Sequence, residues 1–297
     1  MTAIGFLGLG QMGAPVATRL AAGQSLVVYD IDAQRTASFA SENGAQAAED
    51  PTDLAARVDV IITMLPTSAI VRDAIWSGQR ACRSALKAGQ LVIDMSSSDP
   101  ADTKELGKDL QSVGVGLVDA PVSGGVRRAV AGTLAVLVGG DADENVDRAA
   151  ALLTNVGDPI LKVGALGSGH TMKALNNLLS ATTLAASAEV LAAGAAAGID
   201  PELMLDVLNA SSGRNNSTET KIRQFVYSGT YGSGFALDLM VKDLDLANSI
   251  MRRAGTEASV TSATRETWKR AQPDLSGRDH TAIATWLGAP ADFNKGK

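Results

Sequence analysis

The sequence predicts an α/β chain in two parts, a doubly wound sheet over residues 1–163 followed by an all-helical domain over residues 164–297. Three observations predict this arrangement. Short apolar runs alternate with amphipathic stretches through the first half, which is typical of a parallel sheet covered by helices on both faces. A glycine-rich turn follows the first of these runs. Beyond residue 163 the strand-like runs stop and long helical patterns replace them.

The composition is that of an ordinary globular protein. The chain has 297 residues, long enough for two domains, and 45% of them are hydrophobic. The net charge of −6 argues against a nucleic-acid-binding surface. With the single Cys82 and only two histidines, we expect neither a disulfide framework nor a metal site. The N-terminal residues lack the basic and apolar regions of a secretory leader, so we expect a cytoplasmic protein.

The glycine-rich turn lies between a predicted strand and a predicted helix. The run 3–7 (AIGFL) leads into GLGQMG, and an amphipathic stretch over 14–22 follows. In G-x-G-x-x-G spacing the first glycine permits a tight turn, the second lets a pyrophosphate approach the backbone, and the third lets helix and strand pack closely. We therefore expect a Rossmann-type dinucleotide-binding domain. Its predicted contacts in this turn are Gly8, Gly10, Gln11, Met12 and Gly13.

Asp30 follows the second predicted strand, 25–29. A carboxylate at this position accepts the ribose 2′-hydroxyl of NAD and repels the 2′-phosphate of NADP, so we expect NAD rather than NADP. Arg35 lies five residues further on, where an arginine would assist a 2′-phosphate. We expect it in solvent on the next helix.

Further strand-like runs occupy 58–64, 90–95, 116–119 and 134–138, with predicted helices at 34–43, 70–77 and 103–112. The carboxyl ends of parallel strands form the ligand-binding edge of such a sheet. Polar or kinked segments follow three of these strands: LPTS at 65–68, SSS at 96–98 and DAPVSGG at 119–125. In the last segment Ser123, Gly124 and Gly125 offer a hydroxyl and backbone N–H groups that suit a carboxylate, although plain turns use the same residues.

The stretch 164–198 is rich in alanine and leucine and has no proline, which predicts one long helix. Its small residues suit close packing on all sides. Lys173, Asn176, Asn177 and Glu189 interrupt it too often for a membrane span. Lys173 and Asn177 are four residues apart and share a face. A lysine buried on such a helix serves as a proton acceptor, whereas a lysine at its surface is merely solvated.

Further helices are predicted at 201–209, 219–227, 235–255, 260–271 and 280–287. Because a helical domain built on one long helix usually needs a partner surface, we expect a homodimer or homotetramer.

Four motifs in this order resemble the β-hydroxyacid dehydrogenase family, near its 3-hydroxyisobutyrate dehydrogenases and tartronate semialdehyde reductases. The resemblance extends over nearly the whole chain. The motifs are GFLGLGQMGAPVATRL (5–20), DAPVSGG (119–125), GSGHTMKALNN (167–177) and FALDLMVKDLDLA (235–247).

The resemblance implies a catalytic role for Lys173 with Asn177 as its support, and a substrate carboxylate held at Ser123, Gly124 and Gly125. It also implies cofactor contacts at Leu65, Pro66, Ser97 and Lys242. Ser96 is an alternative to Ser97. Neighbouring residues do not share a helix face, so we expect Asp243 to be a poor partner for Lys242, which the resemblance places beside the cofactor.

The implied reaction is hydride transfer between a nicotinamide and a small 3-hydroxy acid, with Lys173 exchanging the hydroxyl proton. Reduction of an aldehyde acid such as tartronate semialdehyde is an alternative. Arg127, Arg128 and Arg214 suit a more polar acid of the threonate or sulfonate type, unless these arginines are solvated or bridge subunits. Two other classes remain open: an imine reductase on the same scaffold, which replacement of Lys173 would favour, and a non-catalytic NAD-binding protein.

Overall fold

The computed structural model describes residues 2–291. They divide into two compact units, the first ending at Lys173 and the second beginning at Ala174. The boundary falls inside helix α8 (Ser168–Ala196), which is the long helix predicted from the sequence.

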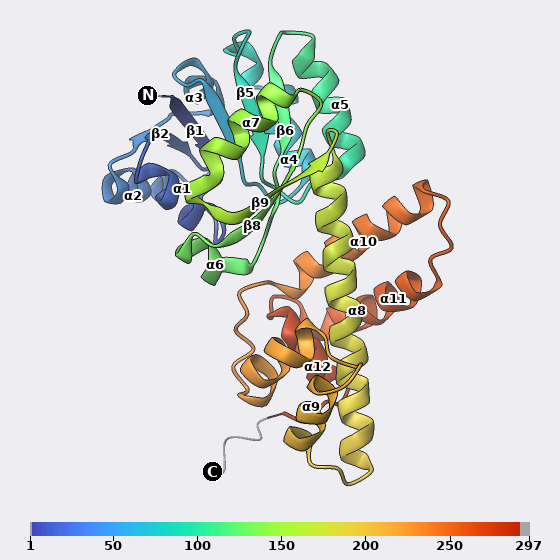
Figure 1. Ribbon diagram of the computed structural model, residues 1–297. Coiled ribbons are helices and arrows are strands. Elements are labelled where there is room, and N and C mark those ends of the chain that lie inside the picture. Colours follow the sequence, from blue (N-terminus) through green and yellow to red (C-terminus); the bar gives the residue numbers. More distant parts are fainter. Residues whose placement is uncertain (1, 292–297) are drawn as a thin grey trace. The chain divides into compact units, whose positions relative to one another are not determined.

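The first unit is built on a sheet of nine strands within the described residues, in the order β3-β2-β1-β4-β5-β6-β8-β7, with β9 beside β8 (Figure 1). Strands β1 to β6 pair in parallel, whereas β8 runs antiparallel to β6 and β7. The strands are β1 (Ala3–Leu7), β2 (Ser25–Tyr29), β3 (Gln46–Ala47), β4 (Val60–Thr63), β5 (Leu91–Asp94), β6 (Gly116–Asp119), β7 (Val122–Ser123), β8 (Leu134–Gly139) and β9 (Gly157–Gly164).

The doubly wound fold class is confirmed, but the sheet is mixed rather than wholly parallel. The chain between β7 and β8 contains only the short helix α6 (Gly125–Ala131). A parallel crossover needs a dozen or more residues, so the chain returns antiparallel instead. Strands β3, β7 and β9 were not predicted, because the first two have only two residues each and β9 is largely exposed.

Several helices of the first unit begin at recognisable capping residues. Asp32, Asp50 and Asp99 each accept a hydrogen bond from a backbone N–H in the first turn of the helix that follows. The helical elements are α1 (Gly13–Ala21), α2 (Ala33–Asn43), α3 (Pro51–Ala56), α4 (Ser68–Arg72), the π-helix η1 (Asp73–Ser77), the 3₁₀ turn η2 (Cys82–Ser84), α5 (Pro100–Gln111), α6, α7 (Asp143–Leu152) and the 3₁₀ turn η3 (Leu153–Asn155).

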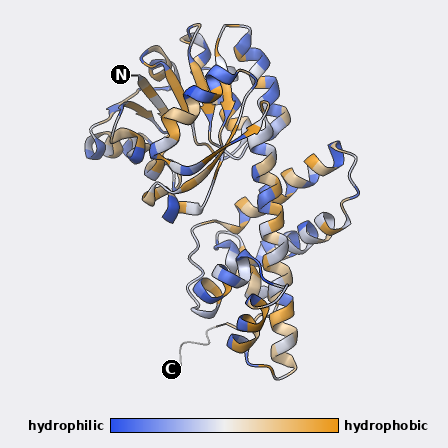
Figure 2. Ribbon diagram, in the orientation of Figure 1, coloured by the Kyte–Doolittle hydropathy of each residue, from blue (hydrophilic) through white to orange (hydrophobic). Residues whose placement is uncertain are grey.

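Alternation along the strands gives this sheet two apolar faces. In β4, Val60 and Ile62 belong to one buried cluster and Ile61 to another. The first cluster includes residues of α1 and α7, and the second includes residues of α3 and α5. Because successive side chains of a strand point to opposite faces, helices cover the sheet on both sides. Figure 2 shows the resulting apolar strands between helices with polar outer surfaces.

The second unit is helical and has its own core. Its elements are the greater part of α8, α9 (Pro201–Asn209), the π-helix η4 (Ser217–Tyr227), α10 (Leu237–Arg253), α11 (Ser259–Leu275), the 3₁₀ turn η5 (His280–Ala282) and α12 (Ile283–Trp286). Apolar residues of α8 recur every three or four positions and are buried with residues of α10 and α11, including Trp268. This stripe consists of Ala174, Leu178, Ala181, Leu184, Ala188 and Leu191.

Within the single chain, α8 does not pack on all sides. Leu179 is 66% exposed and Val190 is 47% exposed, on the side of the helix away from the buried stripe. By length and composition alone, α8 is the one helix among residues 2–291 that could cross a membrane, despite its polar interruptions. The core helix of a soluble protein meets the same criterion, and α8 supplies the core of the second unit.

Candidate active site

The glycine turn lies where the strand order reverses, between β1 and β4. In open α/β sheets this switch point forms the ligand-binding crevice. A Cβ atom at Gly8 would lie 2.4 Å from the Met64 carbonyl oxygen, and one at Gly13 would lie 1.9 Å from the Gly8 carbonyl oxygen. No atom lies within 4 Å of the same position at Gly10. A side chain at Gly8 or Gly13 would therefore clash with the protein's own backbone, whereas the space beside Gly10 is open.

Asp30 fastens the end of β2 to this turn. Its Oδ2 accepts from the Leu9 N–H at 2.7 Å, and its Oδ1 accepts from the Asp32 N–H and from Arg35 Nη1, each at 3.0 Å. Burial raises the pKa of Asp30, but the two N–H groups and Arg35 outweigh burial and hold the pKa below its ordinary value. Asp30 is therefore ionised near neutral pH.

The prediction that Arg35 is simply solvated is wrong. Its guanidinium contacts Asp30 and also lies 3.4 Å from Asp32, although its side chain is 47% exposed. The first turn of α2 brings the arginine back over the two carboxylates. Its positive charge is thus already compensated by two negative charges.

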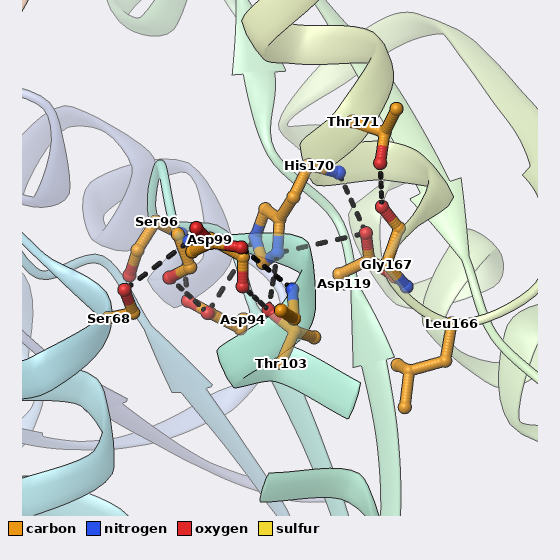
Figure 3. Close-up of polar contacts among 12 residues, drawn as sticks. Ser68, Asp94, Ser96, Asp99, Thr103, Asp119, Leu166, Gly167, His170 and Thr171 are labelled. Carbon is orange, nitrogen blue, oxygen red and sulfur yellow. Dashed lines mark hydrogen bonds and ion pairs between the residues drawn. The ribbon is translucent and has the colours of Figure 1, made fainter. Parts of the chain in front are cut away.

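Asp94, at the end of β5, joins the two loops that follow β4 and β5 (Figure 3). Its Oδ1 accepts from Thr63 Oγ1 at 2.8 Å and from the Ser96 N–H at 2.9 Å, and its Oδ2 accepts from Ser98 Oγ at 2.7 Å. The Ser96 hydroxyl in turn accepts from the Leu65 N–H. Ser96 is buried and holds the loop that contains Leu65 and Pro66, whereas Ser97 is half-buried.

Asp119, at the end of β6, caps the first turn of α8. Its two carboxylate oxygens accept from the N–H groups of Gly167 and His170, at 2.7 and 2.8 Å. Burial, together with the negative charge of Asp94, holds the pKa of Asp119 above its ordinary value, and His170 and the two N–H groups oppose this shift without cancelling it. The sequence analysis gave no role to this carboxylate or to Asp94. Asp119 ends the predicted strand 116–119 and Asp94 is the next-to-last residue of the predicted strand 90–95, and these positions were the available signal.

Lys173 and Asn177 lie one turn apart on α8, and Lys173 is half-buried. Asn177 is buried and donates from Nδ2 to Asp243 Oδ2 of α10 at 2.6 Å. Asp243 is itself buried, 1% exposed. The asparagine is therefore fixed by a carboxylate that the sequence gave no reason to select.

The expectation that Asp243 is a poor partner for Lys242 is wrong. Lys242 Nζ lies 3.5 Å from Asp243 Oδ1. Adjacent residues leave a helix in different directions, but the long lysine side chain bends back toward the buried carboxylate. Asp243 consequently contacts both Asn177 and Lys242.

The DAPVSGG segment spans β6, β7 and the start of α6. Gly124 and Gly125 both have positive φ, 139° and 70°, a conformation that other residues rarely adopt. Ser123 ends β7 and is half-buried. Arg127 and Arg128 are exposed on α6, and Arg214 of the second unit is 3.5 Å from Glu219. A glycine turn with free space beside Gly10 at the sheet's switch point, an ionised acid after β2 and a lysine-bearing helix indicate the class, a dinucleotide-dependent oxidoreductase.

Comparison with known families identifies both halves of the chain. Residues 3–167 match the NAD-binding domain of 6-phosphogluconate dehydrogenase. Residues 167–287 match the NAD-binding domain of NADP-dependent 3-hydroxyisobutyrate dehydrogenase. The chain is 40% identical to 2-(hydroxymethyl)glutarate dehydrogenase of Eubacterium barkeri over 86% of its own length and 83% of the relative. It is 33% identical to 3-sulfolactaldehyde reductase of Escherichia coli over 95% of each chain.

Among solved structures, 3-hydroxyisobutyrate dehydrogenase of Mycobacterium tuberculosis with L-serine superposes with a TM-score of 0.88. The identity is 32%, over 97% of this chain and 99% of that one. The chain belongs to the β-hydroxyacid dehydrogenase family. It is an NAD(P)-dependent oxidoreductase that acts on the CH–OH group of hydroxy acids.

Proposed function

We propose that this protein oxidises a small 3-hydroxy acid of the 3-hydroxyisobutyrate type, with NAD as coenzyme and Lys173 as the group that exchanges the hydroxyl proton. The observation that carries the proposal is the placement of Lys173 on α8, one turn before an asparagine that Asp243 holds in position. A proton acceptor needs a fixed orientation toward its substrate, and a buried hydrogen-bonded neighbour supplies that orientation.

The turn after β1 fits a dinucleotide, because the space beside Gly10 is open and the N-terminus of α1 follows it. Bound NAD supplies the site that accepts hydride from the alcohol carbon. Asp30 would hold the adenosine ribose, and the remaining contacts would lie in this turn, in the loops after β4 and β5 and on α10. The proposed coenzyme contacts besides Asp30 are Gly8, Gly10, Gln11, Met12, Gly13, Leu65, Pro66, Ser97 and Lys242.

For the substrate, we propose that Ser123, Gly124 and Gly125 hold the carboxylate through the serine hydroxyl and backbone N–H groups. Lys173 then takes the hydroxyl proton during oxidation and returns it during reduction, while Asn177 orients the lysine or the substrate hydroxyl. Positioned proton transfer of this kind contributes about 10²–10⁴-fold to the rate.

The substrate class is tested with a panel of acids and the absorbance of NADH. The expected result is reduction of NAD by 3-hydroxyisobutyrate, with slower reaction of glycerate (the alcohol that corresponds to tartronate semialdehyde), threonate and 2-(hydroxymethyl)glutarate. A preference for an acid with a second anionic group would instead favour a polar substrate held by Arg127, Arg128 or Arg214. No reaction with any hydroxy acid in either direction would contradict the proposal.

We expect Asp30→Ala to reduce the preference for NAD over NADP by about tenfold or more, which corresponds to about 1.4 kcal/mol. The ionised Asp30 repels a 2′-phosphate, and its removal also leaves Arg35 with only Asp32 as a partner. The measurement is kcat/KM with each coenzyme. Asp30→Asn is the companion variant, because it removes the charge but keeps one acceptor oxygen for the Leu9 N–H, and it should relax the coenzyme preference as well. Equal use of both coenzymes by the unmodified protein would show that Asp30 does not select NAD.

Lys242→Ala should raise the KM for NAD more than it lowers kcat. A contact that binds coenzyme equally in the ground and transition states affects affinity rather than turnover. Lys269, an α11 lysine 3.0 Å from Asp245, provides the matched control variant Lys269→Ala, which should change neither constant. Unchanged KM and kcat in Lys242→Ala would remove this lysine from the coenzyme site.

We also propose that the protein is a homodimer or homotetramer that buries the apolar residues exposed on the second unit. On α9, Leu203 and Val207 are 57% and 56% exposed. Sedimentation velocity should show an oligomer that Leu203→Lys with Val207→Lys shifts toward monomer. Val130→Lys, at an equally exposed residue of α6, is the control that should leave the oligomer intact. A monomeric unmodified protein at micromolar concentration would refute the proposal.

A further inference from the structure

His170, in the first turn of α8, is buried between two carboxylates of the first unit (Figure 3). Its Nε2 lies 3.6 Å from Asp94 Oδ2 and its Nδ1 lies 3.8 Å from Asp119 Oδ2. Asp94 and Asp119 are register partners on the neighbouring strands β5 and β6, so they extend side by side from the sheet. The reaction described above uses none of these three side chains.

Both carboxylates have the hydrogen bonds of ionised groups. Each of the four carboxylate oxygens accepts from at least one hydroxyl or backbone N–H. Two adjacent buried negative charges repel each other and require a nearby positive charge.

The hydrogen bonds of the ring indicate where that positive charge lies. Thr103 Oγ1 lies 2.9 Å from His170 Nδ1 and 3.0 Å from the Asp99 carbonyl oxygen. When the hydroxyl donates its single hydrogen to that carbonyl, Nδ1 is the donor to Thr103. Within residues 2–291, Nε2 has no hydrogen-bond acceptor or donor and faces Asp94. An unprotonated Nε2 would direct its lone pair at a carboxylate, whereas a proton there makes the contact attractive. In the other neutral tautomer Nδ1 would accept from Thr103, the Asp99 carbonyl oxygen would lose that hydroxyl donor, and the ring would bring no charge to the two carboxylates.

The other charged groups near the cluster do not replace His170. Arg72 and Asp102 line a small hollow together with Asp94, Ser98 and Thr103. The Arg72 guanidinium is hydrogen-bonded to Asp109. In the described part of the chain, His170 is the basic side chain that lies within 4 Å of both buried carboxylates.

We propose that His170 is a positioning residue, a buried imidazolium that holds the loops after β4 and β5 and the start of α8 in one arrangement. Asp94 fixes those loops. Asp119 fixes the first turn of α8, which lies one turn before Lys173. The imidazolium therefore sets the coenzyme-side loops and the lysine relative to each other within the first unit. The effect on turnover rests on the proposed role of Lys173, whereas the charge of the ring does not.

The charge of the ring is measured directly by long-range ¹H–¹⁵N correlation on ¹⁵N-histidine-labelled protein at pH 7.5. The chain has only two histidines, so the spectrum is simple. His280 is the internal reference, because burial lowers its pKa to about 4 and keeps it neutral. The expected result is one ring protonated on both nitrogens, absent in His170→Gln, and one neutral ring. Two neutral rings would overturn the proposal whatever the kinetics.

The positioning role is measured by a double-mutant cycle. His170→Gln should lower kcat by about 10- to 100-fold, as expected for a displaced catalytic group. Adding Asp94→Asn removes the surplus buried charge and should restore part of that loss, so the two substitutions should not be additive. His280→Gln is the matched control for the loss of a buried histidine and should not couple to Asp94→Asn.

Additive losses, or an unchanged kcat in His170→Gln, would overturn the positioning role even if the ring is doubly protonated. If Lys173→Ala keeps its activity, the assignment of the proton-exchanging group fails instead, and the NMR result still decides the charge of His170. Thermal unfolding of each variant identifies any that fail to fold. If His170→Gln is among them, the spectrum of the unmodified protein decides the charge of the ring, and His170→Asn replaces His170→Gln in the double-mutant cycle that decides the positioning role.

Discussion

Replacing Lys173 with alanine should lower kcat by about 10²–10⁴-fold while leaving NAD affinity nearly unchanged. The lysine is half-buried on α8, one turn before Asn177, whose amide is fixed by the buried Asp243. Alanine is a good helix former, so the helix should persist and only the proton-exchanging group is lost. Turnover rate and NAD affinity by fluorescence quenching, measured side by side, separate chemistry from binding.

Lys162→Ala is the control for removal of a lysine from the same unit. Lys162 is exposed at the edge strand β9 and pairs with Asp147, so its loss should leave both quantities unchanged. If Lys173→Ala retained more than about a tenth of the activity, the loss would be too small for positioned proton transfer and Lys173 would lose its assigned role.

Gly10→Ala should weaken NAD binding by about tenfold or more without destabilising the protein, a loss of about 1.4 kcal/mol in binding free energy. A Cβ atom at Gly10 meets no atom of the protein within 4 Å, so the folded chain tolerates the methyl group. The same methyl group would occupy the space through which the pyrophosphate approaches the backbone. Isothermal titration with NAD and thermal unfolding without it measure the two effects.

Gly13→Ala provides the contrast. Its Cβ would lie 1.9 Å from the Gly8 carbonyl oxygen, so this substitution should lower the unfolding temperature as well as the affinity. If Gly10→Ala bound NAD as tightly as the unmodified protein, the coenzyme would not approach the turn as proposed. Equal destabilisation by both substitutions would show that the space beside Gly10 is not spare.

Much of the fold could be predicted because the signals are local. The bounds of β1, β2 and β6 agree with the predicted runs, since each strand is a short apolar segment next to a turn. The absence of proline and the many helix-forming residues in 164–198 were enough to predict α8. The glycine spacing was readable for the same reason, because its three members lie within six residues and act through backbone geometry.

The side-chain partners could not be predicted, because they join residues that are distant in sequence. Asp94 and Asp119 become neighbours only through the register of β5 and β6, and His170 reaches them from a helix that begins 49 residues after Asp119. Asn177 and Asp243 likewise meet only when α8 packs against α10. Hydropathy patterns do not reveal such pairs. In the sequence, a buried polar residue looks like a break in an apolar segment, and only its partner explains why it is there.

The sequence by itself therefore determined the order of the elements, the dinucleotide turn and the helix that carries Lys173. The tertiary structure alone decided that β8 reverses direction, that Arg35 is held by Asp30 and Asp32, and that one side of α8 is exposed. Local propensity and periodicity act within a few residues, and the sequence displays them directly. Burial, charge compensation and strand direction depend on which distant segments come into contact, and those contacts are defined only in the folded chain.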